Sequence, residues 1–588
     1  MKTMNTPPAS LPSRQGQPAQ FWNRIRRGAA MSLAAAIIFA AHSSAFGAAY
    51  YWDFDADATI GTPPASTAGS GTWNATNTNW NLAGAAGSDV AWVANSEAVF
   101  AGSDGTYAIT VGSALTLGNL TFNNSGYTLS ASSALSLTNS TGNSSVTVAT
   151  GATATIGSNV TYANGFNNAV VSLVGTGAPG GSAGTLIIDN GGKVATTFGS
   201  TGIIYVGSTA NTVGTLKATT VQVNTGGSIV SLGSVVANGL LKVEGGSVTS
   251  SGTGIVAIGN YADGTNMPTS AILTINSGTV TAANGLRFGA SGATTNSGGT
   301  LNLNGGTLIT PKVYSSGTAN SSTMNFNGGT LKATVTNNTD FLNTNINNAV
   351  VKAGGAVIDT NTFNVTIQKA LTHDAGLGGT ADGGLTKNST GTLVLSGANT
   401  FTGTTTVSGG TLKVGAGGAL NSSGSILVNT GATIENANGL SITPSMTLQE
   451  GAAVLTSLAG SSFTPTNLTL SGNLSDSWTA IALTNSAGSG LIKGGALTLT
   501  LTGITAGTYS LTSGSGFSGT FSSANVNGSA LTASGADFNG SNIAGFNYSY
   551  TNVSNQLVVS AVPEPATWAL LAFSLTTVVV LRRRRLKA

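Results

Sequence analysis

Few side chains in this sequence of 588 residues could carry out acid–base chemistry. The chain has two histidines, and one of them, His373, precedes Asp374 and lies near Asp382. An imidazole beside carboxylates is typical of general bases and of metal ligands. The surrounding segment is rich in glycine, which favours an exposed connector, so we interpret it as a surface loop. A catalytic role and adventitious metal binding are the alternatives.

A second acidic group, formed by Asp53, Asp55 and Asp57, could present three oxygens to Ca²⁺. An EF-hand loop would continue with glycine and end with glutamate, but Ala58 and Pro64 occupy those positions. We therefore expect a solvated acidic segment. The chain has no cysteine, which excludes disulfides and thiolate metal sites. The sequence predicts neither a metal site nor a cofactor.

The distribution of charge argues against nucleic-acid binding. Five basic residues precede residue 28 and five follow residue 562, which leaves 11 basic and 17 acidic residues between them, or about −6. The only arginine in that region is Arg287. Because phosphate neutralisation needs clustered cations, we exclude nucleic acid as a partner.

Short strands must position these groups, and residues 385–420 show the pattern best. Apolar residues alternate there with Thr and Lys, as in half-buried strands, and Gly409 and Gly410 allow a sharp bend. The residues expected to face a core are Leu393, Leu395, Val407 and Leu412. Lys413 should point outward, so Leu395→Asp should be damaging and Lys413→Glu nearly neutral.

Weaker copies of this half-unit recur along the chain at irregular intervals, in the twenties to low thirties of residues, which is typical of a solenoid with one coil per repeat. The copies start at Leu186, Val221, Leu241, Leu273, Leu301, Met324, Val351 and Ile426. The lysines beside the apolar positions should point outward and aid solubility. Asn302, Asn304, Asn325 and Asn327 could stack into ladders between coils.

The complete unit, residues 385–412, resembles the autotransporter-associated β-strand repeat, also called the passenger-associated transport repeat. The matching residues are Leu385, Lys387, Gly391, Thr392, Leu393, Leu395, Ser396, Gly397, Asn399, Thr400, Thr402, Gly403, Thr405, Thr406, Val407, Gly410, Thr411 and Leu412. Ser389, Phe401 and Thr404 stand where the family usually has Gly, Tyr and Gly. The resemblance implies an all-β fold, a right-handed parallel β-helix, over residues 130–436. Residues 437–561 are β-rich, and periodicity leaves open whether they continue the coils or form a separate domain.

The segment before the coils has two parts. Arg24, Arg26 and Arg27 precede a short apolar run, and small residues follow it, so we predict a signal peptide over residues 1–47. Residues 48–129 contain four of the seven tryptophans: Trp52, Trp73, Trp80 and Trp92. We interpret this part as an aromatic cap on the first coil, because open solenoid ends promote aggregation. Stacking of sugars on the rings is the alternative.

The residues after the β-rich region form a third pattern. Pro563, Glu564 and Pro565 precede an apolar run over residues 566–581, which predicts a single transmembrane helix. A basic cluster follows: Arg582, Arg583, Arg584 and Arg585. Residues 562–588 resemble the PEP-CTERM sorting signal. The resemblance implies anchoring in the inner membrane of a Gram-negative bacterium, cleavage by an exosortase near the tripeptide, and delivery to the cell surface or medium. A permanent anchor is the alternative.

These patterns together predict an exported, non-enzymatic β-solenoid with a structural, adhesive or biofilm role. The alternative is a carbohydrate-active or carbohydrate-binding β-helix that acts on exopolysaccharide, with a surface carbohydrate as partner. A polysaccharide hydrolase needs two convergent carboxylates, whereas the acids of this chain are scattered. We therefore predict no catalytic residue.

Overall fold

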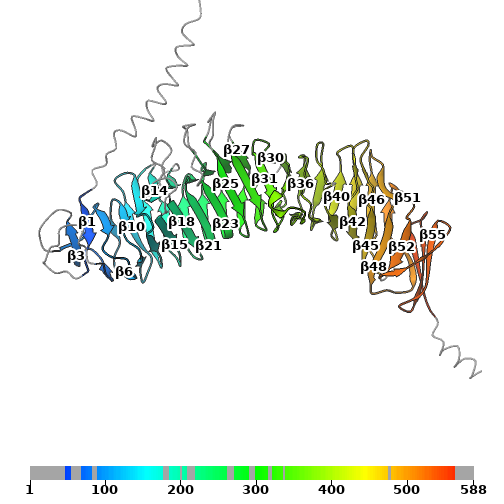
Figure 1. The fold of residues 1–588 in the computed structure, drawn as a ribbon, viewed down its shortest axis with the longest axis horizontal. Coiled ribbons are helices and arrows are strands. Elements are labelled where there is room, and N and C mark those ends of the chain that lie inside the picture. The colour runs from blue at the N-terminus through cyan, green and yellow to red at the C-terminus, as the bar shows by residue number, and fades with distance from the viewer. Residues whose placement is uncertain are drawn as a thin grey trace, which may run out of the picture.

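The computed structural model describes residues 47–54, 68–82, 89–167, 169–175, 184–198, 202–207, 219–260, 271–290, 298–315, 321–335, 338–420, 422–474 and 478–562. These residues form strands from β1 (Ala49–Trp52) to β57 (Gln556–Ala561), with one 3-10 turn, η1 (Ala375–Leu377), and no α-helix. The strands run across the long axis of an elongated, gently bent body (Figure 1). The predicted all-β class is confirmed.

The chain winds in coils of three strands in its first half. One coil consists of β10 (Leu135–Asn139), β11 (Ser144–Val148) and β12 (Thr153–Ile156). Each of these strands pairs in parallel with its counterpart in the next coil, which consists of β13 (Val160–Asn164), β14 (Val170–Gly175) and β15 (Gly184–Ile188). Because every third strand returns to the same side, the coils stack into long parallel sheets, as a β-solenoid requires.

One stack runs through almost the whole body. From β7 (Leu115–Thr116) to β52 (Ser523–Val526), sixteen parallel pairings follow one another. At about 4.8 Å per strand, this stack is about 77 Å long. The coils therefore extend beyond residues 130–436 in both directions.

The copies of the half-unit found in the sequence lie on top of one another. The pairs in direct register are Leu186 with Val221, Val221 with Leu241, Leu241 with Leu273, Leu273 with Leu301, and Leu301 with Met324. They belong to β15, β18 (Thr219–Asn224), β21 (Leu240–Ser250), β23 (Ile272–Ala282), β25 (Gly299–Leu303) and β28 (Ser322–Phe326). The predicted start at Val351 is wrong by two residues. The register partner of Met324 is Ala349, and Val351 pairs with Phe326.

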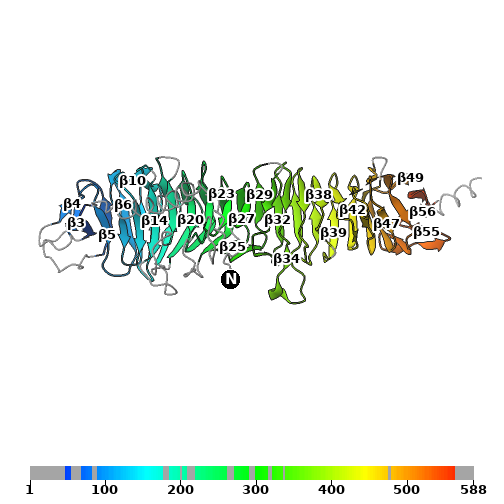
Figure 2. The same ribbon diagram turned by 90° about the horizontal axis from the view of Figure 1, so that it is seen from above.

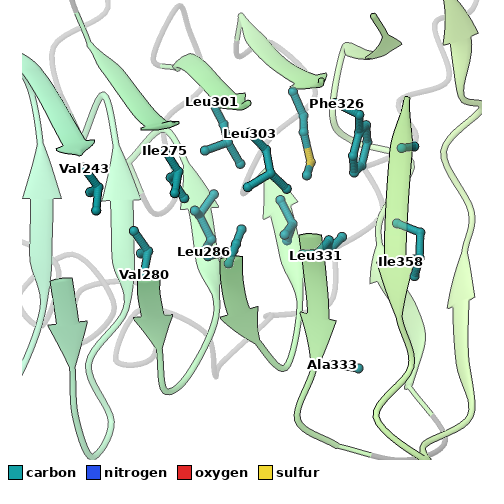
Figure 3. Packing of buried hydrophobic residues seen from close by; sticks show 14 of the residues in the cluster. Val243, Ile275, Val280, Leu286, Leu301, Leu303, Phe326, Leu331, Ala333 and Ile358 are labelled. Atoms are coloured by element: carbon teal, nitrogen blue, oxygen red, sulfur yellow. The ribbon is translucent and has the colours of Figure 1, made fainter. Parts of the chain in front are cut away.

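The interior is one continuous apolar core that follows the axis of the coils. The alternating residues of each strand point into it, including Val243, Leu301, Leu331 and Ile358 (Figure 3). The four residues expected to face the core, Leu393, Leu395, Val407 and Leu412, are 0% exposed. This prediction is confirmed, and its basis is the period-two alternation of the strands.

Amide side chains form two ladders that link successive coils. In the longer one, Asn276 Nδ2 donates to Glu244 Oε1 at 2.7 Å, Asn304 Nδ2 to Asn276 Oδ1 at 2.8 Å, and Asn327 Nδ2 to Asn304 Oδ1 at 3.3 Å. In the shorter one, Asn302 Nδ2 donates to Thr274 Oγ1 at 3.2 Å and Asn325 Nδ2 to Asn302 Oδ1 at 2.8 Å. The predicted asparagine ladders are confirmed.

Three of the outward lysines form ion pairs with the following coil. The pairs are Lys332 with Asp359 at 3.2 Å, Lys352 with Asp374 at 3.0 Å, and Lys413 with Glu435 at 2.6 Å. Two of these pairs join residues that are direct partners in the register. These lysines therefore do more than keep the surface soluble. The ion pair argues against the expectation that Lys413→Glu is nearly neutral, because the new carboxylate would face Glu435.

The two ends of the solenoid differ from its middle by antiparallel pairing. At the first end, β1 pairs antiparallel with β3 (Thr78–Leu82), which pairs with β4 (Val90–Ala91). At the other end, an antiparallel sheet follows the last coil. Its strand order is β49 (Gly507–Ser510), β57, β56 (Phe546–Thr551), β55 (Asp537–Ile543) and β54 (Thr532–Ser534). Residues 437–561 thus contain both continuing coils and a terminal antiparallel sheet.

The predicted leader and tail lie almost entirely outside the described residues. This applies to the signal peptide over residues 1–47 apart from Gly47, and to the sorting signal over residues 562–588 apart from Val562. The expected transmembrane helix, residues 566–581, falls in the second of these segments. Within the described part of the chain, no helix is long and apolar enough to span a membrane.

A charge in the core should be far more damaging than one on the outer face. Leu395→Asp would bury a carboxylate between coils and should lower the free energy of unfolding by about 4 kcal/mol or more. Val394→Asp is the matched control, because Val394 is the register partner of Lys413 and faces outward. It should cost less than about 1 kcal/mol. Thermal and urea unfolding measure both, and equal losses would contradict the assigned faces.

Lys413→Glu should destabilise the coil more than Lys413→Ala. Both variants remove the ion pair with Glu435, whose side chain is 11% exposed, but only the first adds a like charge beside it. We expect a loss of up to about 1 kcal/mol for the alanine variant and a larger loss for the glutamate variant. Added salt should narrow the difference between their melting temperatures.

Candidate functional site

The His373 segment forms a loop on the side of the solenoid. Strand β34 (Thr372–His373) pairs with β31 (Asn348–Val351), and the chain then leaves the coil until β35 (Leu385–Asn388) (Figure 2). Asp374 caps the short turn η1, because its Oδ1 accepts a hydrogen bond from Gly376 N at 3.1 Å. The predicted surface loop is confirmed.

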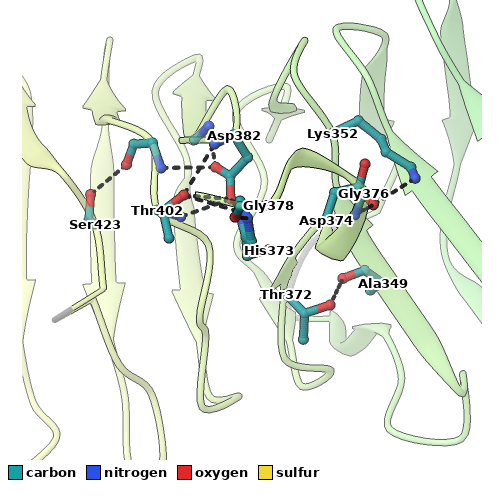
Figure 4. Close-up of polar contacts among 12 residues, drawn as sticks. Ala349, Lys352, Thr372, His373, Asp374, Gly376, Gly378, Asp382, Thr402 and Ser423 are labelled. Carbon is teal, nitrogen blue, oxygen red and sulfur yellow. Dashed lines mark hydrogen bonds and ion pairs between the residues drawn. The ribbon is translucent and has the colours of Figure 1, made fainter. Parts of the chain in front are cut away.

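Both ring nitrogens of His373 are engaged (Figure 4). Nδ1 lies 2.8 Å from Asp382 Oδ2 and 3.1 Å from Thr402 Oγ1, and Nε2 lies 3.2 Å from Gly378 O. A carbonyl oxygen can only accept, so Nε2 carries a proton. The hydrogen bond to Asp382, followed by that to Gly378, raises the pKa of His373 above its usual range. In this arrangement the imidazole stabilises the loop and offers no free nitrogen as a base.

Asp382 fastens the loop to the next coil. Its Oδ1 accepts hydrogen bonds from Gly384 N and Gly403 N, each at 2.9 Å, and its Oδ2 accepts one from Thr402 N at 2.8 Å. Burial raises the pKa of this carboxyl, but the hydrogen bonds outweigh that effect and hold the pKa below its usual range. Asp382 is therefore an anionic acceptor for three backbone amides.

Asp374 belongs to a different contact, because it pairs with Lys352. The hydrogen bond from Lys352 is the main reason why the pKa of Asp374 is lowered. Within the described ranges, no group of three or more His, Cys, Asp or Glu side chains is arranged to hold a metal ion. The three titratable residues that the sequence brings together thus divide between two anchoring contacts.

The residues of the repeat motif build turns and inter-coil contacts. Asn399 accepts a hydrogen bond from Leu371 N at 2.9 Å and donates one to Ala419 O at 3.1 Å, so it links three successive coils. A Cβ at Gly403 would lie 2.2 Å from Asp382 O, so only glycine fits this approach. Gly410 has φ +61°, which provides the expected bend.

Lys387 is a buried lysine at an inward position that was not predicted from the sequence. It is 0% exposed, and its Nζ donates to Thr360 Oγ1 at 3.1 Å, Asn388 O at 3.1 Å and Ser389 O at 2.7 Å. Ser389, which replaces the usual glycine, has φ +67°. Burial lowers the pKa of Lys387 to about 8. The ammonium therefore stabilises this left-handed turn. The spacing in the sequence could have indicated this position, since Leu385 and Lys387 are two residues apart and therefore face the same side of the strand.

The tryptophans do not present their faces to solvent. Trp52, Trp73 and Trp80 are 0% exposed and Trp92 is 7% exposed. Their rings pack on one another, with centroids 4.7 Å apart for Trp80 and Trp92 and 5.0 Å apart for Trp73 and Trp80. A ring enclosed in this way cannot stack on a sugar, so the alternative of sugar stacking on these tryptophans is wrong.

A further expectation concerns the acidic residues Asp53, Asp55 and Asp57. Asp53 is 7% exposed, so it is not solvated as expected, and Asp55 and Asp57 lie outside the described residues.

A groove on the terminal antiparallel sheet is lined by hydroxyl and amide side chains. They include Thr532, Asn539, Ser541, Asn547, Ser549 and Ser560. The groove has no Asp, Glu or His in its lining.

The histidine contact should make the stability of the loop depend on pH. Because the folded pKa of His373 is raised, its contribution is fully present below about pH 6.5, the unfolded value, and is lost as pH rises through the folded pKa. Asp382, whose pKa is lowered, stays charged throughout this window. The melting temperature of His373→Gln should fall below that of the parent at pH 5.5 and approach it at pH 9. A difference that is constant with pH would contradict this.

The comparisons with known proteins match two segments of the chain. Residues 385–414 match the model of the passenger-associated-transport-repeat, and residues 561–585 match that of the PEP-CTERM protein-sorting motif. No curated protein and no solved structure matches the chain. The sorting-motif residues, Pro563 to Pro565 and Arg582 to Arg585, lie outside the described residues. Both predicted resemblances are confirmed: the chain combines a coil similar to the passenger-associated transport repeat with a segment similar to the PEP-CTERM sorting motif.

Proposed function

We propose that this chain is a non-enzymatic structural protein of the cell surface or extracellular matrix, with an adhesive or biofilm role. The match of residues 561–585 to the PEP-CTERM motif carries this proposal, because that motif indicates export and processing by an exosortase. The transmembrane helix over residues 566–581 would hold the body in the inner membrane until cleavage. The released body would then reach the surface.

The architecture supports a role that depends on length and surface. A stack about 77 Å long holds its two ends far apart, as a spacer or matrix component requires. We further propose that the coils are right-handed and that the tryptophan cluster serves as the N-terminal cap. Its enclosed rings support this, since they bury apolar surface at the first coils.

The non-enzymatic part of the proposal rests on the His373 contact. Both nitrogens of the imidazole have partners, and Asp382 is occupied by backbone amides. These are anchoring interactions, and a hydrolase would need a pair of free carboxylates or a free base.

A second candidate function is binding of a neutral carbohydrate in the groove of the antiparallel sheet. Its hydroxyl and amide side chains can donate and accept hydrogen bonds, as sugar hydroxyls require. The double variant Asn539→Ala and Asn547→Ala should weaken retention on a neutral polysaccharide several-fold in an affinity-gel assay. Asn348→Ala, an exposed amide on a coil, is the control. Unchanged retention of the double variant would remove this candidate.

The sorting proposal predicts two distinct failures of localisation. Replacement of Pro563 and Pro565 by Ala should leave export intact and trap the protein in the inner membrane, because only release is blocked. Deletion of residues 566–588 should free the body into the periplasm without surface delivery. Cell fractionation in a host with the matching exosortase measures both. If the proline variant reached the exterior as efficiently as the parent, a simple membrane anchor would replace the sorting proposal.

A further inference from the structure

Lys493 is a buried amine at the junction between the coils and the terminal antiparallel sheet. It ends strand β47 (Gly490–Lys493) and is 5% exposed. Its Nζ lies 4.3 Å from the centroid of the Phe517 ring and 5.8 Å from that of Phe521. None of the ion pairs in the described ranges involves it. Burial lowers the pKa of Lys493 to about 8, which makes a neutral amine accessible near neutral pH.

Asn552 meets this amine from the antiparallel sheet. It directly follows β56 and is 3% exposed, and its main-chain oxygen accepts a hydrogen bond from Lys493 Nζ. Its own carboxamide is held at both ends: Oδ1 lies 3.5 Å from Phe521 N, and Nδ2 donates to Ala536 O. The amine and the carboxamide are thus enclosed together, 59 positions apart in the chain.

A carboxyl group contacts the main chain of Asn552. Asp537 Oδ1 accepts a hydrogen bond from Asn552 N at 2.9 Å. Phe521 lies between the two sides, with its ring centroid 6.1 Å from that of Tyr550, which is 1% exposed. The amine and the carboxamide are shielded from water, and a carboxyl contacts the main chain of the residue that carries the carboxamide. An amine, a carboxamide and a carboxyl are the groups that amide exchange requires.

We propose that Lys493 and Asn552 form an intramolecular isopeptide bond. The neutral Nζ attacks Cγ of Asn552, the Nζ–Cγ bond forms, and the Cγ–Nδ2 bond breaks. One proton passes from Nζ to Nδ2, which leaves as ammonia, so the reaction needs no oxidant or other reactant. Rotations of the two side chains bring Nζ from the main-chain oxygen to Cγ of the same residue.

The neighbouring groups have defined roles in this reaction. The amide N–H of Phe521 points at Oδ1, where negative charge develops during the attack. To Asp537, whose carboxylate contacts the main-chain N–H of Asn552, the proposal assigns the transfer of the proton from the amine to the leaving nitrogen. The product joins the last coils to the antiparallel sheet, and a cross-link of this kind restricts the unfolded chain as a disulfide does.

Mass spectrometry of the full chain, purified from cells and denatured, tests the proposal directly. A digest of the parent should contain a branched peptide in which Lys493 is joined to residue 552, with one ammonia less than the two free peptides. Lys493→Met should abolish the branched peptide, whereas Lys387→Met, which removes the other strongly buried lysine, should leave it intact. Asp537→Asn should slow its formation by about 100-fold.

The result for the parent protein tests the isopeptide bond by itself, even if the variants do not fold. Free peptides that contain an unmodified Lys493 and an unmodified Asn552 would overturn the proposal. A free Lys493 beside a deamidated residue 552 would overturn it too, because the carboxamide would then have reacted with water instead. The proposal is independent of the sorting and carbohydrate proposals.

Discussion

Parallel pairing between successive coils is the constraint on which this structure depends. No coil can bury its inward side chains alone, so each strand must match the register of the strand before it. The continuous apolar core and the glycine at position 403 follow from that condition. So do the amide ladders, because equivalent positions of neighbouring coils lie one strand spacing apart. A strand that slipped by one residue would turn its inward side chains outward.

Much of the coiled region could be predicted because its signals are local. Alternating apolar residues before a glycine-containing corner identify a strand and its inward face, and five successive pairs of half-unit starts lie in register. Prediction failed where the deciding partner was distant in the sequence. The ion pair of Lys413 depends on Glu435, and the antiparallel sheet at the end uses the same alternation as the coils do. Period two does not distinguish parallel from antiparallel partners.

In the candidate site, too, local features could be predicted and contacts with distant residues could not. His373, Asp374 and Asp382 could be found from their types and spacing, and the loop that carries them was expected. The contacts that decide their chemistry come from the next coil, through Thr402 and Gly403. Lys387 and Lys493 were not identified as buried, because a charged residue at an inward position contradicts the pattern that identifies a core. Such residues are recognised only once the turn or sheet that they contact is known.

The longer amide ladder has an electrical consequence. Every Nδ2 in it points toward the preceding coil and every Oδ1 toward the following one, and Gly354 N ends the row at Asn327 Oδ1. Amide dipoles aligned in this way add along the axis, as peptide dipoles add along an α-helix. The positive pole of the row is its first coil, where the carboxylate of Glu244 accepts the terminal hydrogen bond. The negative carboxylate therefore lies at the positive end of the row, which is the electrostatically favourable arrangement. Each added amide polarises its neighbours further.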